Sequence, residues 1–188
     1  LALEAQIALD DLDSRSSAEG HPSRYALTVG GHGRLAGSAA WRAFYTQASS
    51  LAFRTFNPQE NFTDAGVGLG RNFDDDDQTT LVVTIPFRNR WLVSPELTLL
   101  RQGEGRINDP YPGTRAERLA TPALFIGTVE RVWRAAVSVT GTQGPFRVTA
   151  SGGMDHTVNT DNQPGITSDR FEGRILIAIG VTRSGPLH

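Results

Sequence analysis

The stretch Arg170–Thr182, RFEGRILIAIGVT, decides the fold class. Its apolar and small side chains recur at every second position and so share one face of an extended strand: Phe171, Gly173, Ile175, Ile177, Ile179 and Val181. Polar and charged side chains fall on the other face: Arg170, Glu172, Arg174 and Thr182. A period of two with one apolar face predicts a half-buried β-strand.

The segments before this stretch follow the same rule. Phe146, Val148, Ala150 and Met154 oppose Arg147, Thr149, Ser151 and Asp155, and before them Trp133, Ala135, Val137 and Val139 oppose Arg134, Ser138 and Thr140. Similar segments lie near residues 1–10, 24–30, 35–47, 65–73, 79–88 and 91–102, which brings the expected number of strands to nine. The alternation therefore predicts a meander of antiparallel strands.

The connections between these segments indicate hairpins of alternating length. Gly30–Gly33, Arg88–Arg90 and Gly141–Pro145 are rich in residues that tolerate turn dihedral angles. Longer connections are expected near 11–23, 48–64, 103–120 and 158–169. Short turns at one end and long loops at the other are typical of outer-membrane barrels, although 74–78 and 88–90 would be consecutive short connections.

We therefore expect an all-β fold, an antiparallel up-and-down transmembrane β-barrel, as a partial barrel of about nine or ten strands. Residues 1–188 would form a single β-barrel domain or the C-terminal fragment of a larger barrel, since the chain starts at Leu1 inside an alternating run. A soluble β-sandwich has the same alternation. Aromatic residues near the ends of the apolar faces, such as Trp41, Trp91 and Phe146, favour the barrel.

Composition excludes several classes of function. A net charge of -2 gives no basic face for nucleic acid, and the absence of cysteine removes disulfides, thiolate catalysis and cysteine zinc sites. No apolar run approaches the roughly 18–20 residues that a membrane-spanning helix needs.

Motifs for catalysis or metal binding are missing. The four histidines are dispersed, and there is neither a GxSxG elbow nor a phosphate-binding loop. Asp74–Asp77 offers carboxylates for Ca²⁺, but it lacks the glycine and terminal glutamate of an EF-hand, so a solvated turn is the favoured interpretation. We expect no enzyme, no metal site and no cofactor.

Charged side chains on the polar faces are the candidate ligand-binding residues. They are Arg134, Arg147, Arg170, Glu172 and Arg174, whose guanidinium groups could hold an acidic polysaccharide or a permeating anion. The alternative is an Arg–Glu network that only satisfies the lumen, and it is favoured because interior charges of barrels normally pair. Glu104 and Arg106 are a second candidate, in a loop that could contact glycan.

Three stretches resemble the capsule-assembly Wzi-like outer-membrane family. The first is Ser94–Pro112, SPELTLLRQGEGRINDPYP, and the others are Tyr45–Asn61, YTQASSLAFRTFNPQEN, and Gly66–Asp77, GVGLGRNFDDDD. The resemblance covers about residues 40–182. It implies the C-terminal part of a larger barrel in the bacterial outer membrane.

The resemblance also implies a function, which is to assemble or attach capsule or surface polysaccharide by non-covalent binding. The expected partners are outer-membrane lipid and surface polysaccharide, with no nucleic acid. A porin-like outer-membrane channel and a soluble β-sandwich carbohydrate-binding module remain the alternatives.

Overall fold

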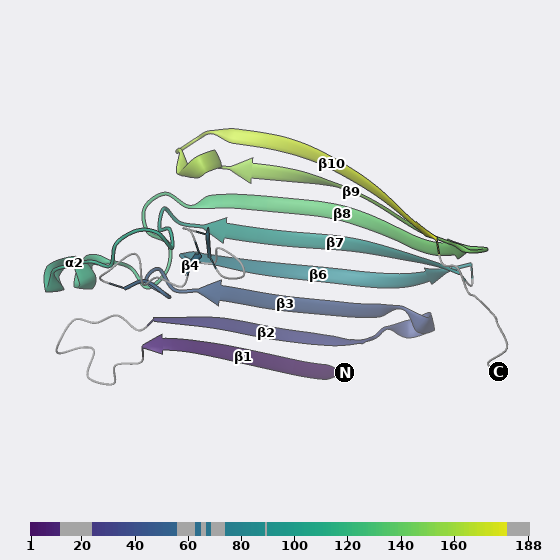
Figure 1. The fold of residues 1–188 in the computed structure, drawn as a ribbon, viewed down its shortest axis with the longest axis horizontal. Helices are drawn as coiled ribbons and strands as arrows, with labels where there is room; N and C mark the ends of the chain where they lie inside the picture. Colours follow the sequence, from purple (N-terminus) through teal and green to yellow (C-terminus); the bar gives the residue numbers. More distant parts are fainter. Residues whose placement is uncertain (12–23, 56–62, 65–66, 69–73, 89, 180–188) are drawn as a thin grey trace, which may run out of the picture.

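Eight strands form one antiparallel sheet in the order β1-β2-β3-β6-β7-β8-β9-β10 (Figure 1). The computed structural model describes residues 1–11, 24–55, 63–64, 67–68, 74–88 and 90–179. The strands of the sheet are β1 (Ala2–Asp11), β2 (Arg24–Arg34), β3 (Ala40–Ala48), β6 (Asp76–Phe87), β7 (Trp91–Gln102), β8 (Glu130–Gln143), β9 (Phe146–Val158) and β10 (Thr167–Ile179). Apart from β3 and β6, which β4 and β5 separate in the sequence, neighbouring strands in the sheet are consecutive strands of the chain. The expected all-β antiparallel meander is therefore confirmed.

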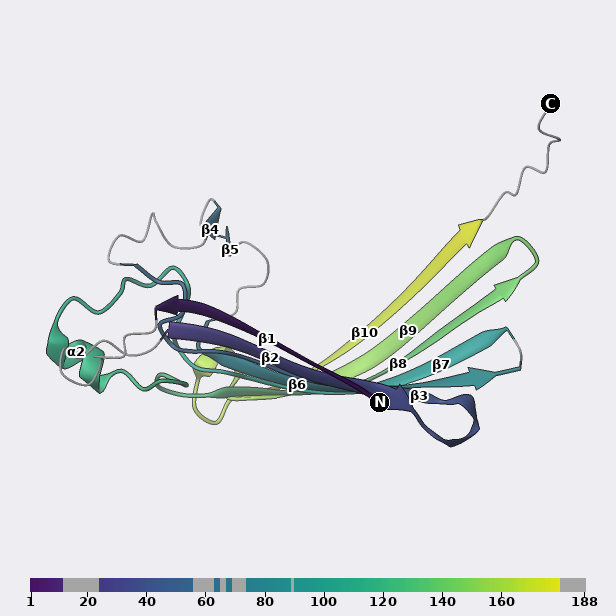
Figure 2. The same cartoon turned by 90° about the horizontal axis from the view of Figure 1, so that it is seen from below.

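The sheet is open. β1 and β10 form its two edges and do not pair with each other, so the strands do not close into a barrel. Figure 2 shows that the strands fan out along the sheet, which is strongly twisted. Twist of this kind follows from the right-handed twist of each strand.

Of the expected ninth strand at 65–73, the structure describes only two residues, and these do not join the sheet. Val67–Gly68 (β5) pairs only with Thr63–Asp64 (β4) in a separate two-stranded sheet, and the rest of that segment lies outside the described residues. The expected connection at 74–78 is also wrong, because β6 begins at Asp76. Without these two features the short connections 35–39, 88–90 and 144–145 alternate with the long connections 49–75, 103–129 and 159–166.

The glycine run Gly30–Gly33 is not the expected hairpin, because it lies inside β2. The chain turns instead at 35–39, through the short helix η1 (Ala36–Ser38). A Cβ atom on Gly33 would lie 3.0 Å from Nε1 of Trp41, and one on Gly31 would lie 3.4 Å from the same indole ring. These glycines therefore leave room for a tryptophan on the neighbouring strand.

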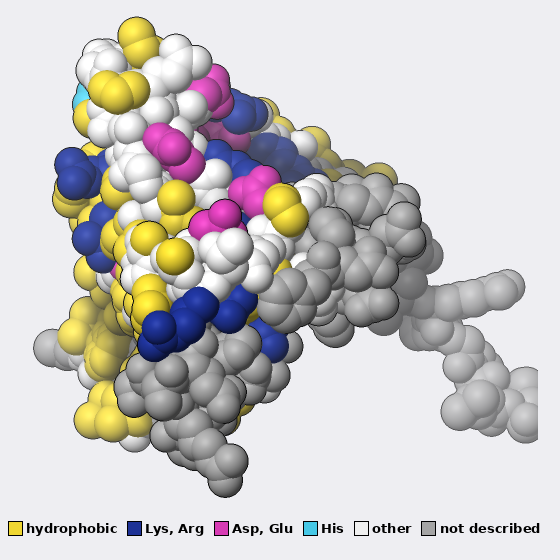
Figure 3. Space-filling view, turned by 90° about the vertical axis from the view of Figure 1, so that its left-hand side faces the viewer, with side chains coloured by type: hydrophobic (Ala, Val, Ile, Leu, Met, Phe, Trp, Pro, Cys, Tyr) yellow, Lys and Arg dark blue, Asp and Glu magenta, His cyan; other side chains and the backbone are white. Residues whose placement is uncertain are grey.

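Strand register places the apolar side chains on one face of the sheet. Leu81, Leu97, Ala135, Met154 and Phe171 form one continuous row across β6 to β10. Leu97 is 61% exposed and Phe171 is 76% exposed, so this face has no protein cover in the part of the chain that the structure describes. In the end-on view of Figure 3, hydrophobic side chains gather down the left-hand side of the molecule.

Buried apolar residues lie at the end of β3 and in the long connections rather than under the sheet. Ala48, Leu51, Ala52, Ile107 and Tyr111 are buried together with several polar side chains. The short helix α2 (Arg115–Ala120) lies in this loop layer and begins with a capping box between Thr114 and Glu117.

None of the described helices is long and apolar enough to cross a membrane.

Candidate functional site

Hydroxyl pairs run across the polar face of the sheet. Thr28 and Thr46 lie within 3.2 Å of each other, as do Thr84 and Ser94. Thr80 and Thr98 are 2.9 Å apart, and Thr140 and Thr149 are 3.1 Å apart. Each pair joins neighbouring strands, so the polar face is a hydrogen-bonded surface.

An ion-pair network centred on Arg134 lies in the middle of this face. Its guanidinium donates to Asp155 on β9 at 3.0 Å and to Glu172 on β10. Nε of Arg134 is also 3.9 Å from Glu96 on β7. A single cation thus lies within ion-pair distance of carboxylates from three other strands.

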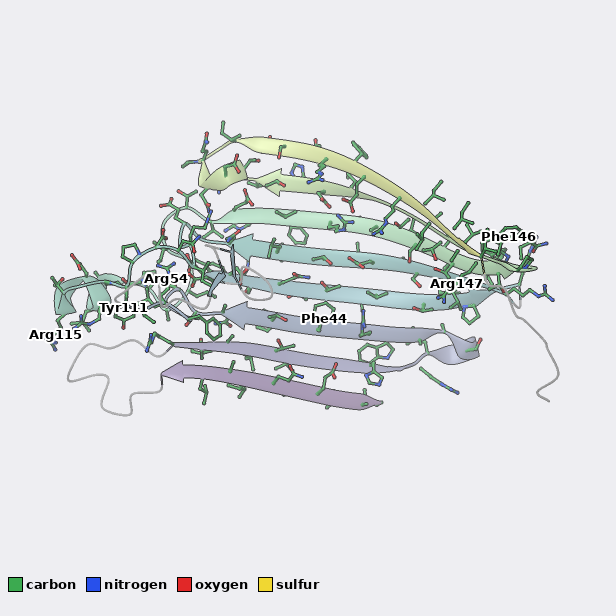
Figure 4. The ribbon with its side chains drawn as sticks, in the orientation of Figure 1. Phe44, Arg54, Tyr111, Arg115, Phe146 and Arg147 are labelled. Carbon is green, nitrogen blue, oxygen red and sulfur yellow. The ribbon has the colours of Figure 1, made fainter. Side chains whose placement is uncertain are left out.

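The structure brings some of the predicted polar-face residues together and separates others. Arg170 lies opposite Asp155 in the register, beside the network of Arg134 and Glu172. Arg174 and Arg134 line a hollow of about 420 Å³. Arg147 shares the face but lies near the opposite end of the sheet, beside the short turns (Figure 4). The predicted charged residues therefore do not form one cluster. Arg134 and Glu172 belong to a network, whereas Arg147 lies far from it.

A larger hollow on the same face has residues that the sequence analysis missed. It measures about 1030 Å³ and is lined by His32, Arg34 and Arg42 on one side and by Glu96 on the other. Small side chains, including Ala40, Thr84, Ser94 and Ser138, form its floor. Reading Gly30–Gly33 as a turn concealed His32 and Arg34, whereas a strand through these glycines would have placed both on the polar face.

The acidic run Asp74–Asp77 is buried, which corrects the expected solvated turn. Asp75 is 0% exposed and accepts hydrogen bonds from the Ser50 hydroxyl at 2.8 Å and from the backbone N–H groups of Gly105, Phe125 and Ile126. Its carboxylate therefore joins the connection after β3 to the connection after β7. Buried carboxylates are stable only when they are paired in this way.

Asp74 forms the second buried contact of the loop layer. Its carboxylate is 2.6 Å from Nε of Arg54, and both side chains are almost fully buried. Burial raises the pKa of Asp74 from 3.8 to about 7, although Arg54 opposes the shift. Another nitrogen of Arg54 lies 3.7 Å from Asp109.

The loop residues Glu104 and Arg106 are exposed, but both form hydrogen bonds within the protein. Glu104 accepts from the backbone N–H of Thr128 at 2.8 Å. The Arg106 guanidinium donates to the carbonyl groups of Gly103 and Gly105 and to Asn162 at 2.6 Å. These contacts hold neighbouring connections together, so they explain the two charges without a glycan.

Arg101 and Asp77 form an ion pair on the same face of the sheet as the apolar side chains, at the end where the long connections lie. Arg101 donates to Asp77, and its guanidinium lies 4.9 Å from the Phe125 ring centre. Tyr45 also donates to Asp77, at 3.1 Å. Arg101 occupies a position at which the alternation would place an apolar residue. Its charge is neutralised by Asp77, beyond the loop-side end of the apolar rows.

No protein-family model, curated protein or solved structure matches this chain.

Within the described residues, no group of three or more histidine, aspartate or glutamate side chains is placed to hold a metal ion. The polar face instead offers charges and hydroxyl groups spread over several strands. Such groups can donate and accept hydrogen bonds, and those of the charged side chains are charge-assisted. The opposite face is apolar apart from polar pairs toward the loop end, such as Arg101 with Asp77 and His156 with Asp169.

Proposed function

We propose that this sheet is part of the wall of a membrane-spanning β-barrel in the bacterial outer membrane. Its apolar face would contact lipid. Its polar face would bind surface polysaccharide non-covalently, in capsule assembly or attachment. The single observation that carries the proposal is the broad exposed apolar face opposite a hydrogen-bonded polar face.

The length of the apolar face supports a membrane. Along β7 the apolar positions run from Trp91, beside a short turn, to Leu99, which lies opposite Trp133. This span of eight steps is about 27 Å at about 3.4 Å per residue. A strand tilted by about 40° would then cover about 21 Å of membrane thickness, close to the apolar band of about 25 Å in outer-membrane barrels.

Aromatic residues at both limits of this span support the same assignment. Trp91 pairs with Phe87 at the short-turn end, and Tyr45 and Trp133 lie in one row at the other end. Aromatic side chains prefer the interface between lipid and water. The charged pair of Arg101 and Asp77 lies one row beyond Trp133, on the loop side.

A soluble sandwich is disfavoured by the exposed apolar face. It requires a second sheet packed about 10 Å from the first. In the part that the structure describes, the remaining sheet is only the β4–β5 pair, which has two residues in each strand. It is too small to cover the apolar rows.

Quenching of the native tryptophans tests the membrane assignment without a substitution. All three tryptophans, Trp41, Trp91 and Trp133, occupy apolar-face positions. Lipids brominated on their acyl chains should quench most of the fluorescence of the reconstituted protein, and iodide in the water should quench little. Strong iodide quenching, or a monodisperse monomer without detergent, would contradict the proposal.

Binding of glycan is tested separately. The protein in liposomes should retain an acidic capsular polysaccharide and should conduct few ions in a planar bilayer. Large conductance without retention of glycan would favour a porin-like channel instead.

A further inference from the structure

We propose that the hollow beside His32, Arg34 and Arg42 is a binding site for a carboxylate-bearing polysaccharide chain. The inference deepens the proposed function, on which it rests for the source of the glycan. The charge and shape of the hollow stand without it.

The two arginines on one wall of the hollow, Arg34 and Arg42, are not paired with an acidic side chain that the structure describes. His32, Arg34 and Arg42 are exposed, and none of them forms an ion pair with a described residue. Arg134, by contrast, lies among three carboxylates. The guanidinium carbon of Arg42 lies 5.8 Å from the centre of the Phe44 ring. This wall is therefore the part of the hollow that attracts an anion.

The spacing of the cations fits a chain of anions better than a single ion. In the register His32 lies opposite Arg42, and Arg34 lies opposite Ala40, two positions away along β3. The two arginine levels are thus about 7 Å apart along the strand direction. A planar guanidinium binds a carboxylate through two parallel hydrogen bonds, so successive carboxylates could each meet one arginine.

The floor and the opposite wall add the groups that a sugar requires. Thr84, Ser94 and Ser138 lie on successive strands and provide hydroxyl groups, while their small side chains leave the hollow open. Glu96 on the far wall can accept hydrogen bonds from sugar hydroxyl groups. A volume of about 1030 Å³ exceeds the need of one inorganic anion and is within reach of an oligosaccharide.

The test compares two double variants of the full chain in detergent micelles. Arg34→Gln/Arg42→Gln removes the cations of the wall. Arg88→Gln/Arg90→Gln removes the same charge from the turn between β6 and β7, outside the hollow. The probe is polygalacturonate, a carboxylated polysaccharide, and neutral dextran and inorganic phosphate are the comparison ligands. Circular dichroism checks that each variant keeps its β structure.

The wall variant should bind polygalacturonate at least about tenfold more weakly than the wild type, because each arginine contributes a charge-assisted pair. The turn variant should bind as the wild type does, and Arg34→Lys/Arg42→Lys should retain intermediate binding because it keeps the charge but loses the planar fork. Equal losses in the two glutamine variants, or no loss in either, would overturn the site. If inorganic phosphate bound to the wild type as tightly as polygalacturonate does, the proposed class of ligand would be wrong.

The outcome is separable from that of the membrane assignment. Tryptophan quenching does not depend on Arg34 or Arg42. If quenching fails while the wall variant loses binding, the site stands and the membrane assignment falls. If quenching succeeds while the wall variant binds normally, only the site is wrong.

Discussion

The indole ring of Trp91 on β7 lies directly against the backbone of Gly141 on β8. The two residues are paired in the register, and a Cβ atom on Gly141 would overlap the ring. Trp41 is likewise paired with Gly33 on β2, where a Cβ atom would lie 3.0 Å from the indole nitrogen. In both places a glycine accommodates a tryptophan on the apolar face, beside the short turns.

Gly141→Ala should therefore destabilise the protein by about 1–3 kcal/mol, because the ring of Trp91 must move away from the added methyl group. Gly152→Ala is the matched control, since its Cβ would lie 3.6 Å from the nearest atom, the carbonyl oxygen of Glu172. The measurement is the urea concentration at which the protein unfolds from liposomes. Equal midpoints for the two variants would show that the close contact between Trp91 and Gly141 does not affect stability.

Asp75→Asn should open the loop layer. An amide nitrogen cannot accept the hydrogen bonds that one carboxylate oxygen now receives, and the loss at a buried site should cost about 3 kcal/mol or more. Faster hydrogen exchange at the amides of Phe125 and Ile126 would report the opening. Asp169→Asn, which changes an exposed carboxylate on β10, should leave these two amides unaffected.

Asp74 should make the loop layer less stable as the pH rises. Its pKa is about 7 in the folded protein and 3.8 without burial, so between these values the folded form holds a proton that the unfolded chain has released. Stability from this group is therefore greatest near pH 4 and falls until about pH 7. Thermal melting between pH 4 and 8 should show the decline in the wild type and a smaller decline in Asp74→Asn.

Neighbouring residues of β10 offer a direct comparison of the two faces. Ile175→Arg places a charge on the apolar face and should cost about 2–4 kcal/mol if that position lies near the middle of the bilayer. Leu176→Arg places the same charge on the polar face and should cost much less. The folded fraction in liposomes measures both effects. Similar fractions for the two variants would mean that lipid does not cover the apolar face.

Periodicity predicted most of the sheet because each strand has one apolar and one polar face. The pattern at Arg170–Thr182 and the two segments before it correspond to β10, β9 and β8. Errors arose where glycine obscured the period. Gly30–Gly33 suggested a turn but continues β2, and the alternating glycines of 65–73 suggested a strand, of which the described residues Val67–Gly68 do not join the sheet.

The candidate site was predicted in part. Strand parity placed Arg134, Glu172 and Arg174 on one face, but it gave no distances along the strands and so grouped Arg147 with them. The burial of Asp74 and Asp75 could not be foreseen, because their partners Arg54, Gly105 and Ile126 are distant in the sequence. Nothing in the local sequence of four consecutive aspartates indicates that they are buried and bonded to distant residues.

The carboxylate of Asp75 has a consequence for the order in which the chain folds. Every strand pairing in the sheet joins neighbours in the meander, so hairpins can form successively with little entropic cost of loop closure. Asp75, in contrast, accepts hydrogen bonds from residues as distant in the sequence as Ser50 and Ile126. Asn162 in turn donates to the carbonyl groups of Gln102 and Thr128. We therefore expect the loop layer to close late, and protection of its amides in pulse-labelling experiments should mark the last stage of folding.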